Sequence, residues 1–395
     1  MSGCWREGDG DHLTKILVYG GWFGSGNTGD DAILIGLREL LTETLPDAEI
    51  IALSTDPQQT RRVCGVDAHP LRSPRQLLAP PWREIRQYTR LFREADACIL
   101  SGGTPIYDHD HLSRAIHCGL PLALRRKLIC FGIGVKPISS RRGRSAVKAL
   151  LGRTASISTR DPDSKLCLRA IGIEGEIQVT GDSALLLRER RPPPQALARI
   201  NSEEERLRVA VCPRALSPEH KHHYHAPLSE TEIRGIRRTL AEAADRLSQA
   251  GHLILFIPLH KNHGEDDTVE ISRIKSRMRK PSVVIDERLS PEGVAGLLGE
   301  MEAVIGMRLH SLILAAARGV PVVSVDYDPK IQGFMEYAGI SEYLFRIDEK
   351  AEVLVRGVER GMEDRKGLET KLLRSCSEMR RKMREEALRI RELLS

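Results

Sequence analysis

The chain has 395 residues, of which 41% are hydrophobic, and a formal net charge of +6. This length exceeds what one hydrophobic core ordinarily holds and predicts two domains of similar size. The mild positive charge is not concentrated in long basic blocks, which favours anionic small molecules over nucleic acid as partners. No apolar run reaches the roughly 18 residues of a membrane span.

The first residues and the cysteines indicate the cellular compartment. Residues 1–10 lack the apolar core of a signal peptide. The eight cysteines are scattered without any Cys-x-x-Cys pair, and several lie inside apolar, strand-like runs. Buried free thiols are typical of a reducing environment, so we expect a cytoplasmic protein.

The first half alternates short strands rich in Val, Ile and Leu with amphipathic helices. This alternation predicts a doubly wound parallel sheet covered by helices on both faces. Helices are expected at residues 30–45 and 144–151. The expected strands are residues 15–19, 49–53, 97–101, 128–132 and 156–159.

A turn with five glycines, within residues 20–29, joins the first strand to the first helix. Glycines let the backbone turn sharply and approach a ligand closely. The spacing departs from the dinucleotide-binding fingerprint, and the Lys-Ser ending of a P-loop is absent, so neither standard nucleotide motif is met. We expect Asp30 or Asp31 to cap the helix.

Two polar loops contain residue types that bind metals. Residues 108–111 (Asp-His-Asp-His) follow the strand that ends near Ser101, and residues 220–225 include four histidines after a strand that ends at Arg214. Adjacent residues on one loop rarely converge on one ion without partners from elsewhere in the fold. We therefore predict no metal site, and interpret the first loop as solvated or facing an acceptor and the second as a polar loop at a cleft.

A polar stretch at residues 188–206 contains three consecutive prolines and no periodicity, which predicts an interdomain linker. It divides the chain into an N-terminal domain at 1–187, a C-terminal domain at 207–345 and a helical segment at 346–395. In that last segment, apolar residues recur at helical spacing among many charges, which predicts long helices packed on the domain, with a coiled-coil or partner-binding role as the alternative. The second set of expected strands is residues 207–212, 252–258, 282–286, 303–305 and 320–325.

Three cationic residues surround one short helix of the second half. Arg308 and His310 lie on a strand-to-helix turn, and Lys330 lies just past the following strand. In an open parallel sheet, the carboxyl ends of strands and the amino ends of helices share one edge, where backbone N–H groups and the helix dipole favour an anion. The pattern predicts a phosphate or carboxylate pocket.

Together these segments resemble the polysaccharide pyruvyltransferase family, over most of the chain. The motifs that carry the resemblance are Gly-Ser-Gly-Asn-Thr-Gly-Asp at 24–30, Leu-Ser-Gly-Gly at 100–103, Gly-Ile-Gly at 132–134, Ser-Thr-Arg-Asp at 158–161 with Ser164, Thr-Gly-Asp at 180–182, Arg-Leu-His-Ser at 308–311 and Tyr-Asp-Pro-Lys at 327–330. The resemblance implies an α/β fold of two Rossmann-like domains that face a cleft, as in B-type glycosyltransferases (GT-B). Residues 104–111 depart from the family pattern, which suggests a loop adapted to a different acceptor.

The resemblance also implies the reaction and its donor site. Such enzymes transfer the pyruvyl group of phosphoenolpyruvate to hydroxyls of a sugar as a ketal and release phosphate. Donor binding is implied for Arg160, Arg308 and Lys330, and the glycine loop, represented by Gly26, Asn27 and Asp30, is implied to line the same cleft. Phosphoenolpyruvate carries up to three negative charges, which suits several cationic donors. We expect no metal ion and no cofactor, because the required cations are encoded as side chains.

The catalytic residues that we assign are His310, Arg308 and Lys330. Ketal formation requires a proton on the methylene carbon of phosphoenolpyruvate, and His310 is the expected donor, because imidazole titrates near neutral pH and lies beside the anion pocket. Asp161 and Asp182 are expected either to orient arginines or to accept a proton from the attacking hydroxyl. The expected acceptor-binding residues are His260, Lys261, Asp108 and Arg214.

Two other functions stay open at this point. A nucleotide-sugar-dependent glycosyltransferase would use the same architecture, since fold does not determine function, although Arg308, His310 and Lys330 suit a compact trianion better. A non-catalytic protein that binds anionic glycans is the second alternative, although such a protein could lose the cleft cations, which are all present here. The acceptor can be a sugar, a lipid-linked glycan or a polymeric glycan. A lipid-linked acceptor would bring the protein to the inner membrane surface. The sequence does not specify the oligomeric state.

Overall fold

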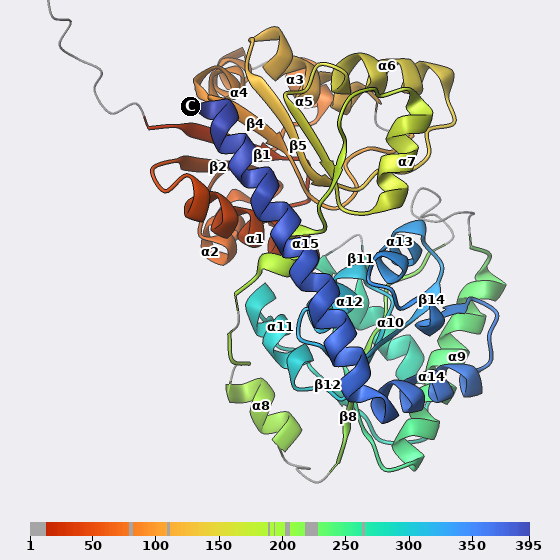
Figure 1. Ribbon diagram of the computed structural model, residues 1–395. Coiled ribbons are helices and arrows are strands. Elements are labelled where there is room, and N and C mark those ends of the chain that lie inside the picture. Colours follow the sequence, from red (N-terminus) through yellow and green to blue (C-terminus); the bar gives the residue numbers. More distant parts are fainter. Residues whose placement is uncertain are drawn as a thin grey trace, which may run out of the picture.

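The computed structural model describes residues 13–395 except 79–81, 109–110, 189, 193, 202–205, 218–227 and 263–264. Two parallel sheets form the centres of two lobes, and a long C-terminal helix runs along both lobes (Figure 1). Each sheet carries helices on its faces, as the alternating sequence pattern predicts.

The N-terminal sheet has seven parallel strands in the order β3-β2-β1-β4-β5-β6-β7. Their bounds are β1 (Lys15–Tyr19), β2 (Glu49–Ser54), β3 (Asp67–Pro70), β4 (Ala97–Leu100), β5 (Lys127–Ile133), β6 (Ser156–Thr159) and β7 (Gln178–Val179). The five predicted strands are confirmed. Strands β3 and β7 were not predicted, because one is half polar and the other has two residues. The strand order reverses direction between β1 and β4, and a crevice opens at the carboxyl ends of strands at such a point.

The helices of the N-terminal lobe fill the connections between these strands. Their bounds are α1 (Thr28–Thr44), α2 (Pro57–Cys64), α3 (Pro74–Leu78), α4 (Trp82–Glu94), α5 (His111–Ala123), α6 (Arg141–Leu151), α7 (Pro162–Ile171) and the 3-10 helix η1 (Ser183–Leu186). The prediction that Asp30 or Asp31 caps α1 is wrong. The cap is Asn27, whose side-chain oxygen accepts a hydrogen bond from the N–H of Gly29. Both aspartates therefore lie in the first turn, where the helix dipole favours a carboxylate.

The C-terminal sheet has six parallel strands in the order β12-β9-β8-β13-β14-β15. Its strands are β8 (Arg208–Cys212), β9 (Leu253–Phe256), β12 (Val283–Val284), β13 (Ala303–Gly306), β14 (Val322–Asp326) and β15 (Leu344–Arg346), and a separate antiparallel pair is β10 (Lys261–Asn262) with β11 (Glu265–Asp266). The helices of this lobe are α9 (Glu230–Gln249), α10 (Asp267–Lys275), α11 (Pro291–Gly299), α12 (Leu309–Ala316), α13 (Pro329–Tyr337), the 3-10 helix η2 (Ser341–Tyr343) and α14 (Ala351–Glu363). The stretch predicted as a linker contains a short helix, α8 (Pro194–Asn201), and the exact domain bounds stay a prediction.

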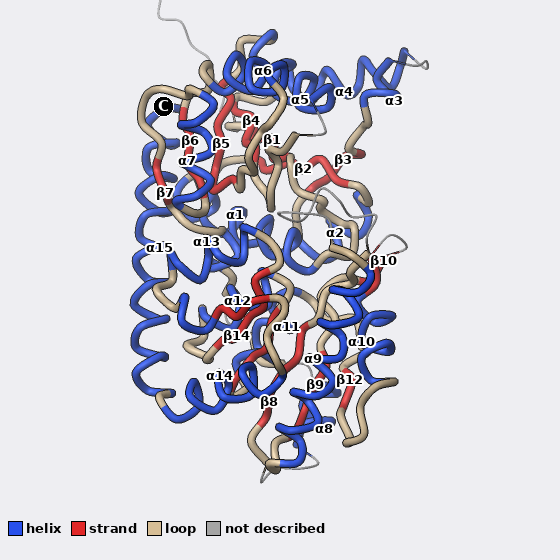
Figure 2. The backbone as a smooth tube through the Cα atoms, turned by 90° about the vertical axis from the view of Figure 1, so that its right-hand side faces the viewer, coloured by secondary structure: helices blue, strands red, loops and turns tan. Residues whose placement is uncertain are grey.

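The long C-terminal helix α15 (Arg365–Leu394) confirms the predicted terminal helices and connects the lobes. Figure 2 shows it beside both lobes. Its Arg380 donates hydrogen bonds to the carbonyl oxygens of Leu185 and Ala317, and its Glu386 accepts one from Ser156 at the start of β6. A single helix thus contacts both lobes through polar groups.

The hydrophobic interior also crosses between the lobes. One continuous core joins α1 and the adjacent face of the N-terminal sheet to the whole C-terminal sheet, whereas the opposite face of the N-terminal sheet has a core of its own. The seven cysteines in the described part of the chain are free, and all except Cys167 are buried. Within the described residues, no helix has the length and apolar character needed to cross a membrane.

Candidate active site

A cavity of about 490 Å³ lies between the two lobes, where both sheets turn their carboxyl ends toward each other. It is lined by residues that follow β1, β4, β5 and β6 of one sheet and β8, β9, β13 and β14 of the other. Its cationic side chains are Lys136, Arg160, Arg214, Arg308 and Lys330, and its histidines are His260 and His310. The structure therefore brings together cationic side chains from both halves of the chain, from Lys136 to Lys330.

His310 lies in the first turn of α12 and reaches across to the N-terminal lobe. Its Nε2 is 3.5 Å from the carboxylate of Asp182. A Cβ atom on Gly29 would lie 1.9 Å from Nδ1 of this imidazole, so only glycine leaves room for the ring against the start of α1. The imidazole is thereby held between a carboxylate and the first turn of a helix.

Asp182 carries a negative charge beside His310 although it is buried. Burial alone would raise the pKa of Asp182, but the nearby His310 and Arg160 outweigh it and the pKa lies below its usual value. Asp182 is therefore ionised at neutral pH. An ionised, buried carboxylate orients an imidazole and stabilises its cationic form.

Asp30 faces the same cavity from the first turn of α1. Burial raises the pKa of this carboxyl, and His310, His260 and Lys330 only partly oppose the effect. The side chain of Asn27 donates a hydrogen bond of 2.6 Å to it. Asn27 and Asp30 thus line the cavity as predicted, whereas Gly26 lines a neighbouring cavity and its carbonyl accepts a hydrogen bond from the N–H of Lys261.

Three cations share one buried carboxylate, that of Asp328. Its oxygen Oδ2 is 3.3 Å from Nζ of Lys136, 3.7 Å from Nζ of Lys330 and 3.9 Å from Arg214. Burial would raise the pKa of Asp328, but these three cations outweigh it and lower the value. Burial lowers the pKa of Lys330 to about 7, although Asp328 opposes the shift. Arg214 also pairs with Glu265 at 3.2 Å, whereas Lys136 and Lys330 share Asp328, so these two lysines are the groups of this cluster that suit a further anion.

Arg160 follows β6 and is held by three neighbours. Its Nε is 3.2 Å from Asp161, its Nη2 donates a 3.0 Å hydrogen bond to Thr104, and its Nη1 is 3.9 Å from Asp182. A Cβ atom on Gly134 would lie 2.7 Å from Nη2, so the glycine makes room for the guanidinium. The side chain is fixed at the wall of the cavity. Its neighbour Asp161 also caps α7.

Arg308 lines the cavity, but carboxylates of its own lobe balance its charge. Nε and Nη2 donate to the fully buried Asp267, with a shortest distance of 2.7 Å, and Nη1 donates to Glu265 at 2.9 Å. Asp267 also accepts hydrogen bonds from the backbone N–H groups of Leu259 and His260. Arg308 therefore holds the loop after β9 in place, and a direct contact between Arg308 and the donor stays a prediction.

Of the four predicted acceptor residues, the structure brings His260 and Arg214 into the cavity but not Asp108 or Lys261. Asp108 instead accepts hydrogen bonds from the hydroxyls and N–H groups of Ser139 and Ser140. Nζ of Lys261 donates to the carbonyl oxygens of Asp286 and Glu287, and Lys261 lines the neighbouring cavity of about 390 Å³.

Most residues of the two predicted polar loops lie outside the part of the chain that the structure describes. Residues 220–225 lie outside the described part of the chain, as do residues 109 and 110. Among the described residues, no group of three or more His, Cys, Asp and Glu side chains is arranged to hold a metal ion.

Lys136, Trp22 and Tyr107 line the cavity and were not predicted. Lys136 follows β5 two residues after the Gly-Ile-Gly motif, so the rule that singled out Arg160, a cation just past a strand, also applies to it. Trp22 lies within the glycine turn that was predicted to face the cleft.

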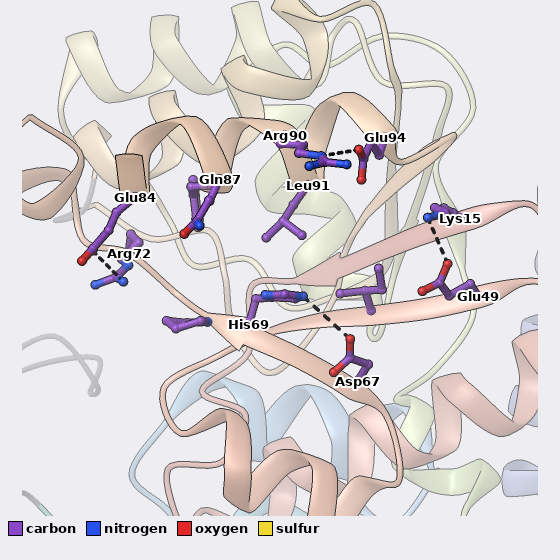
Figure 3. A pocket seen from close by; sticks show the side chains of 13 residues that line it. Lys15, Glu49, Asp67, His69, Arg72, Glu84, Gln87, Arg90, Leu91 and Glu94 are labelled. Atoms are coloured by element: carbon purple, nitrogen blue, oxygen red, sulfur yellow. Dashed lines mark hydrogen bonds and ion pairs between the residues drawn. The ribbon is translucent and has the colours of Figure 1, made fainter. Parts of the chain in front are cut away.

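A second cavity, of about 450 Å³, lies on the outer edge of the N-terminal lobe between α4 and strands β1 to β3 (Figure 3). Its charged residues already have partners of opposite charge: Lys15 pairs with Glu49, Asp67 with Arg61, Arg72 with Glu84, and Arg90 with Glu94. Opposite charges that already neutralise each other in pairs offer no excess charge to an anion. The interdomain cavity is therefore the better candidate for an anionic substrate.

Comparison with known proteins identifies similar sequences. Residues 27–329 match the sequence profile described as polysaccharide pyruvyl transferase. The chain is also 24% identical over 364 residues to the amylovoran biosynthesis protein AmsJ of Erwinia amylovora, a match that covers 83% of this chain and 87% of AmsJ. Of the interdomain-cavity side chains discussed above, Trp22 and Lys330 lie outside the matched residues.

Solved structures with the same architecture are more distant in sequence. A glycosyltransferase from Rickettsia africae ESF-5 has a TM-score of 0.60 at 11% identity, covering 96% of this chain and 98% of its own. The UDP-GlcNAc 2-epimerase of Neisseria meningitidis, bound to UDP-GlcNAc, has a TM-score of 0.58 at 12% identity, covering 96% of this chain and 100% of its own. At such identities the likeness concerns the fold alone, and it confirms the predicted GT-B arrangement of two Rossmann-like domains.

Proposed function

Because this chain belongs to the polysaccharide pyruvyl transferase family, we propose that it transfers the pyruvyl group of phosphoenolpyruvate to hydroxyls of a sugar, forming a ketal and releasing phosphate. The observation that carries the proposal is the position of Lys136, Arg214 and Lys330 around Asp328, in the same cavity as His310. This combination offers an anion site beside a proton donor.

The donor binds through its phosphate and carboxylate groups. Lys136, Lys330 and Arg160 bind these two groups, each charge-assisted contact contributing about 1.5–3 kcal/mol. Arg214 is fully buried among Glu265, Asp328 and Tyr327 and holds Asp328 in place. The donor adds a negative group beside Lys136 and Lys330, which share the carboxylate of Asp328.

His310 supplies the proton that starts the reaction. Its transfer to the methylene carbon of phosphoenolpyruvate leaves an oxocarbenium-like centre, which a sugar hydroxyl attacks. The neutral imidazole then takes the hydroxyl proton. The bond between carbon and the phosphate oxygen breaks, a second hydroxyl attacks the same carbon and closes the ketal, and the proton of this second hydroxyl goes to the departing phosphate. Asp182 stabilises the imidazolium at the start and end of this cycle.

The acceptor is a sugar of a polysaccharide or of its lipid-linked precursor. The relative AmsJ is named for amylovoran biosynthesis, which suits a polysaccharide product. We place the reaction in the cytoplasm, because buried free thiols suit a reducing compartment. If the acceptor is lipid-linked, pyruvyl transfer would take place at the inner membrane surface.

Binding of phosphoenolpyruvate tests the proposal without knowledge of the acceptor. Calorimetry is expected to show that the wild-type protein binds phosphoenolpyruvate, and that Lys136→Met weakens binding by roughly ten- to a hundredfold, because one charge-assisted contact is lost. Lys366→Met, which removes an exposed cation on α15, is the control and should bind normally. Lys136 is a better target than Arg308, whose removal would leave Asp267 buried without its main partner.

A panel of nucleotide sugars belongs in the same experiment. Binding of a nucleotide sugar without binding of phosphoenolpyruvate would contradict the proposal and favour a glycosyltransferase. Binding of phosphoenolpyruvate would justify a search for the acceptor by phosphate release.

Phosphoenolpyruvate binding is expected to weaken above pH 7. Burial lowers the pKa of Lys330 to about 7 in the empty site, so the side chain is charged below this pH and neutral above it. The bound anion favours the charged form and raises the pKa again, so binding above pH 7 takes up a proton and the affinity falls by up to roughly tenfold per pH unit. The phosphate itself is already fully ionised in that range.

Calorimetry at pH 8 in two buffers of different ionisation enthalpy measures the proton uptake directly. Lys330→Arg keeps its charge at every pH and should remove both the uptake and the pH dependence. Equal heats in the two buffers for the wild-type protein would show that Lys330 is already charged in the empty site.

A further inference from the structure

An exposed tryptophan stands at the mouth of the interdomain cavity. Trp22 is 65% exposed to solvent and also lines the cavity. Eight large hydrophobic side chains are exposed in the described part of the chain, and Trp22 is the one among them that lines this cavity. A large exposed aromatic side chain at a cavity mouth is typical of a binding surface, because its flat face gains most when a ligand covers it.

The backbone around Trp22 is held firmly on both sides. The next residue, Phe23, is fully buried, and its carbonyl accepts hydrogen bonds from the hydroxyls of Ser54 and Thr55. On the other side, a Cβ atom on Gly102 would lie 2.4 Å from the Cα of Gly21, so two glycines let the loop lie directly on the residues after β4. The loop therefore holds the indole at a fixed place, although the indole itself is not packed in the interior of the protein.

We propose that Trp22 is the platform on which the sugar ring of the acceptor stacks during pyruvyl transfer. This inference rests on the proposed function and names the chemical class that the mouth of the cavity recognises, a hexopyranose residue. One face of such a ring carries several C–H groups, and this apolar face lies flat on the indole while the hydroxyls at the ring edge point toward His310 and the bound donor. The exposed Asn262 and the half-buried Tyr107 also line the cavity and offer polar groups to the remaining hydroxyls.

The donor does not account for this side chain. Phosphoenolpyruvate is a compact anion without a ring to stack, and the cations that suit it surround Asp328. A sugar residue at the end of a glycan enters from solvent, and the exposed indole of Trp22 offers it a flat surface along the cavity lining. A nucleobase would also stack on an indole, so uridine diphosphate belongs among the probes.

The chain offers a matched control for the test. Trp82 at the start of α4 is 69% exposed and does not line the cavity. Saturation-transfer NMR with methyl β-galactopyranoside, methyl β-glucopyranoside and uridine diphosphate, each added with saturating phosphoenolpyruvate, would be compared for the wild-type protein, Trp22→Ala, Trp22→Phe and Trp82→Ala. We expect a glycoside to bind the wild-type protein and Trp82→Ala equally, Trp22→Ala to bind it at least about tenfold more weakly, and Trp22→Phe to keep most of the affinity.

Three outcomes would overturn the inference. In the first, Trp22→Ala binds the glycoside as well as the wild-type protein does. In the second, the wild-type protein binds no glycoside. In the third, the protein binds uridine diphosphate and not a glycoside, and this binding depends on Trp22. Each of these leaves the proposed donor chemistry intact so long as all variants bind phosphoenolpyruvate normally. A wild-type protein that binds no phosphoenolpyruvate would instead contradict the proposed function.

Discussion

Replacing His310 with glutamine is expected to lower the rate of pyruvyl transfer by a factor of about 10² to 10⁴, the usual contribution of a positioned acid or base. The glutamine amide can face Asp182 in place of the imidazole but cannot donate a proton to carbon. Phosphoenolpyruvate should still bind, because Lys136, Lys330 and Arg160 are unchanged. The measurement is phosphate release at saturating donor together with calorimetric donor binding.

Asp182→Asn separates positioning from proton transfer. The amide fills the same space but lacks the negative charge that stabilises the imidazolium 3.5 Å away. The rate should fall, because the amide no longer stabilises the positive charge that the imidazole carries in the proposed cycle. Unchanged calorimetric binding of phosphoenolpyruvate by this variant would show that the loss of rate does not come from a disturbed cavity. For the His310→Gln variant of the preceding paragraph, full activity would show that His310 does not take part in the reaction.

The sequence alone was sufficient for the architecture of this protein, because the signals involved are local. A buried parallel strand needs a continuous apolar run, such as Ile-Leu-Val-Tyr at 16–19, and such runs are visible without knowledge of their partners. The first helix was misjudged by two residues for a related reason. Asn27, Thr28, Asp30 and Asp31 are all residues that cap helices well, and only the backbone conformation shows which one does.

The contents of the cavity were predicted only in part, because pairing between distant residues leaves no local signal. Arg308 was expected to face the donor; it lines the cavity, and its guanidinium also makes three hydrogen bonds to Asp267, 41 residues away in the sequence, a pairing that the sequence did not predict. The contact between His310 and Asp182 joins the two lobes and could not be read from either motif. Lys136 is one of 60 basic residues, and its position beside Asp328 distinguishes it from the rest.

Replacing Asp267 with asparagine is expected to lower the free energy of unfolding by about 3–5 kcal/mol, the usual cost of removing one partner from a buried ion pair. Asp267 is completely buried, and Arg308 is 8% exposed. The asparagine amide would place a donor group against a guanidinium that also donates, so the arginine charge would keep only Glu265 as its close carboxylate partner. Chemical denaturation measures the change, and Asp286→Asn, whose side chain is 65% exposed, is the control with an expected effect near zero.

The double variant Asp267→Asn, Arg308→Met identifies the cause of this loss. Asp267 has two roles, since its carboxylate pairs with Arg308 and also accepts hydrogen bonds from the N–H groups of Ala215, Leu259 and His260. Asp267 accepts from Ala215 through Oδ1 and from Leu259 and His260 through Oδ2, so the single asparagine oxygen can keep only one of these two sets. If the buried charge of Arg308 is the main cost, removing that charge should restore a large part of the stability, because an apolar side chain of similar length leaves nothing uncompensated. A double variant as unstable as Asp267→Asn would show instead that the carboxylate acts mainly through the backbone after β9, and that Arg308 is held in the cavity for the substrate rather than for the fold.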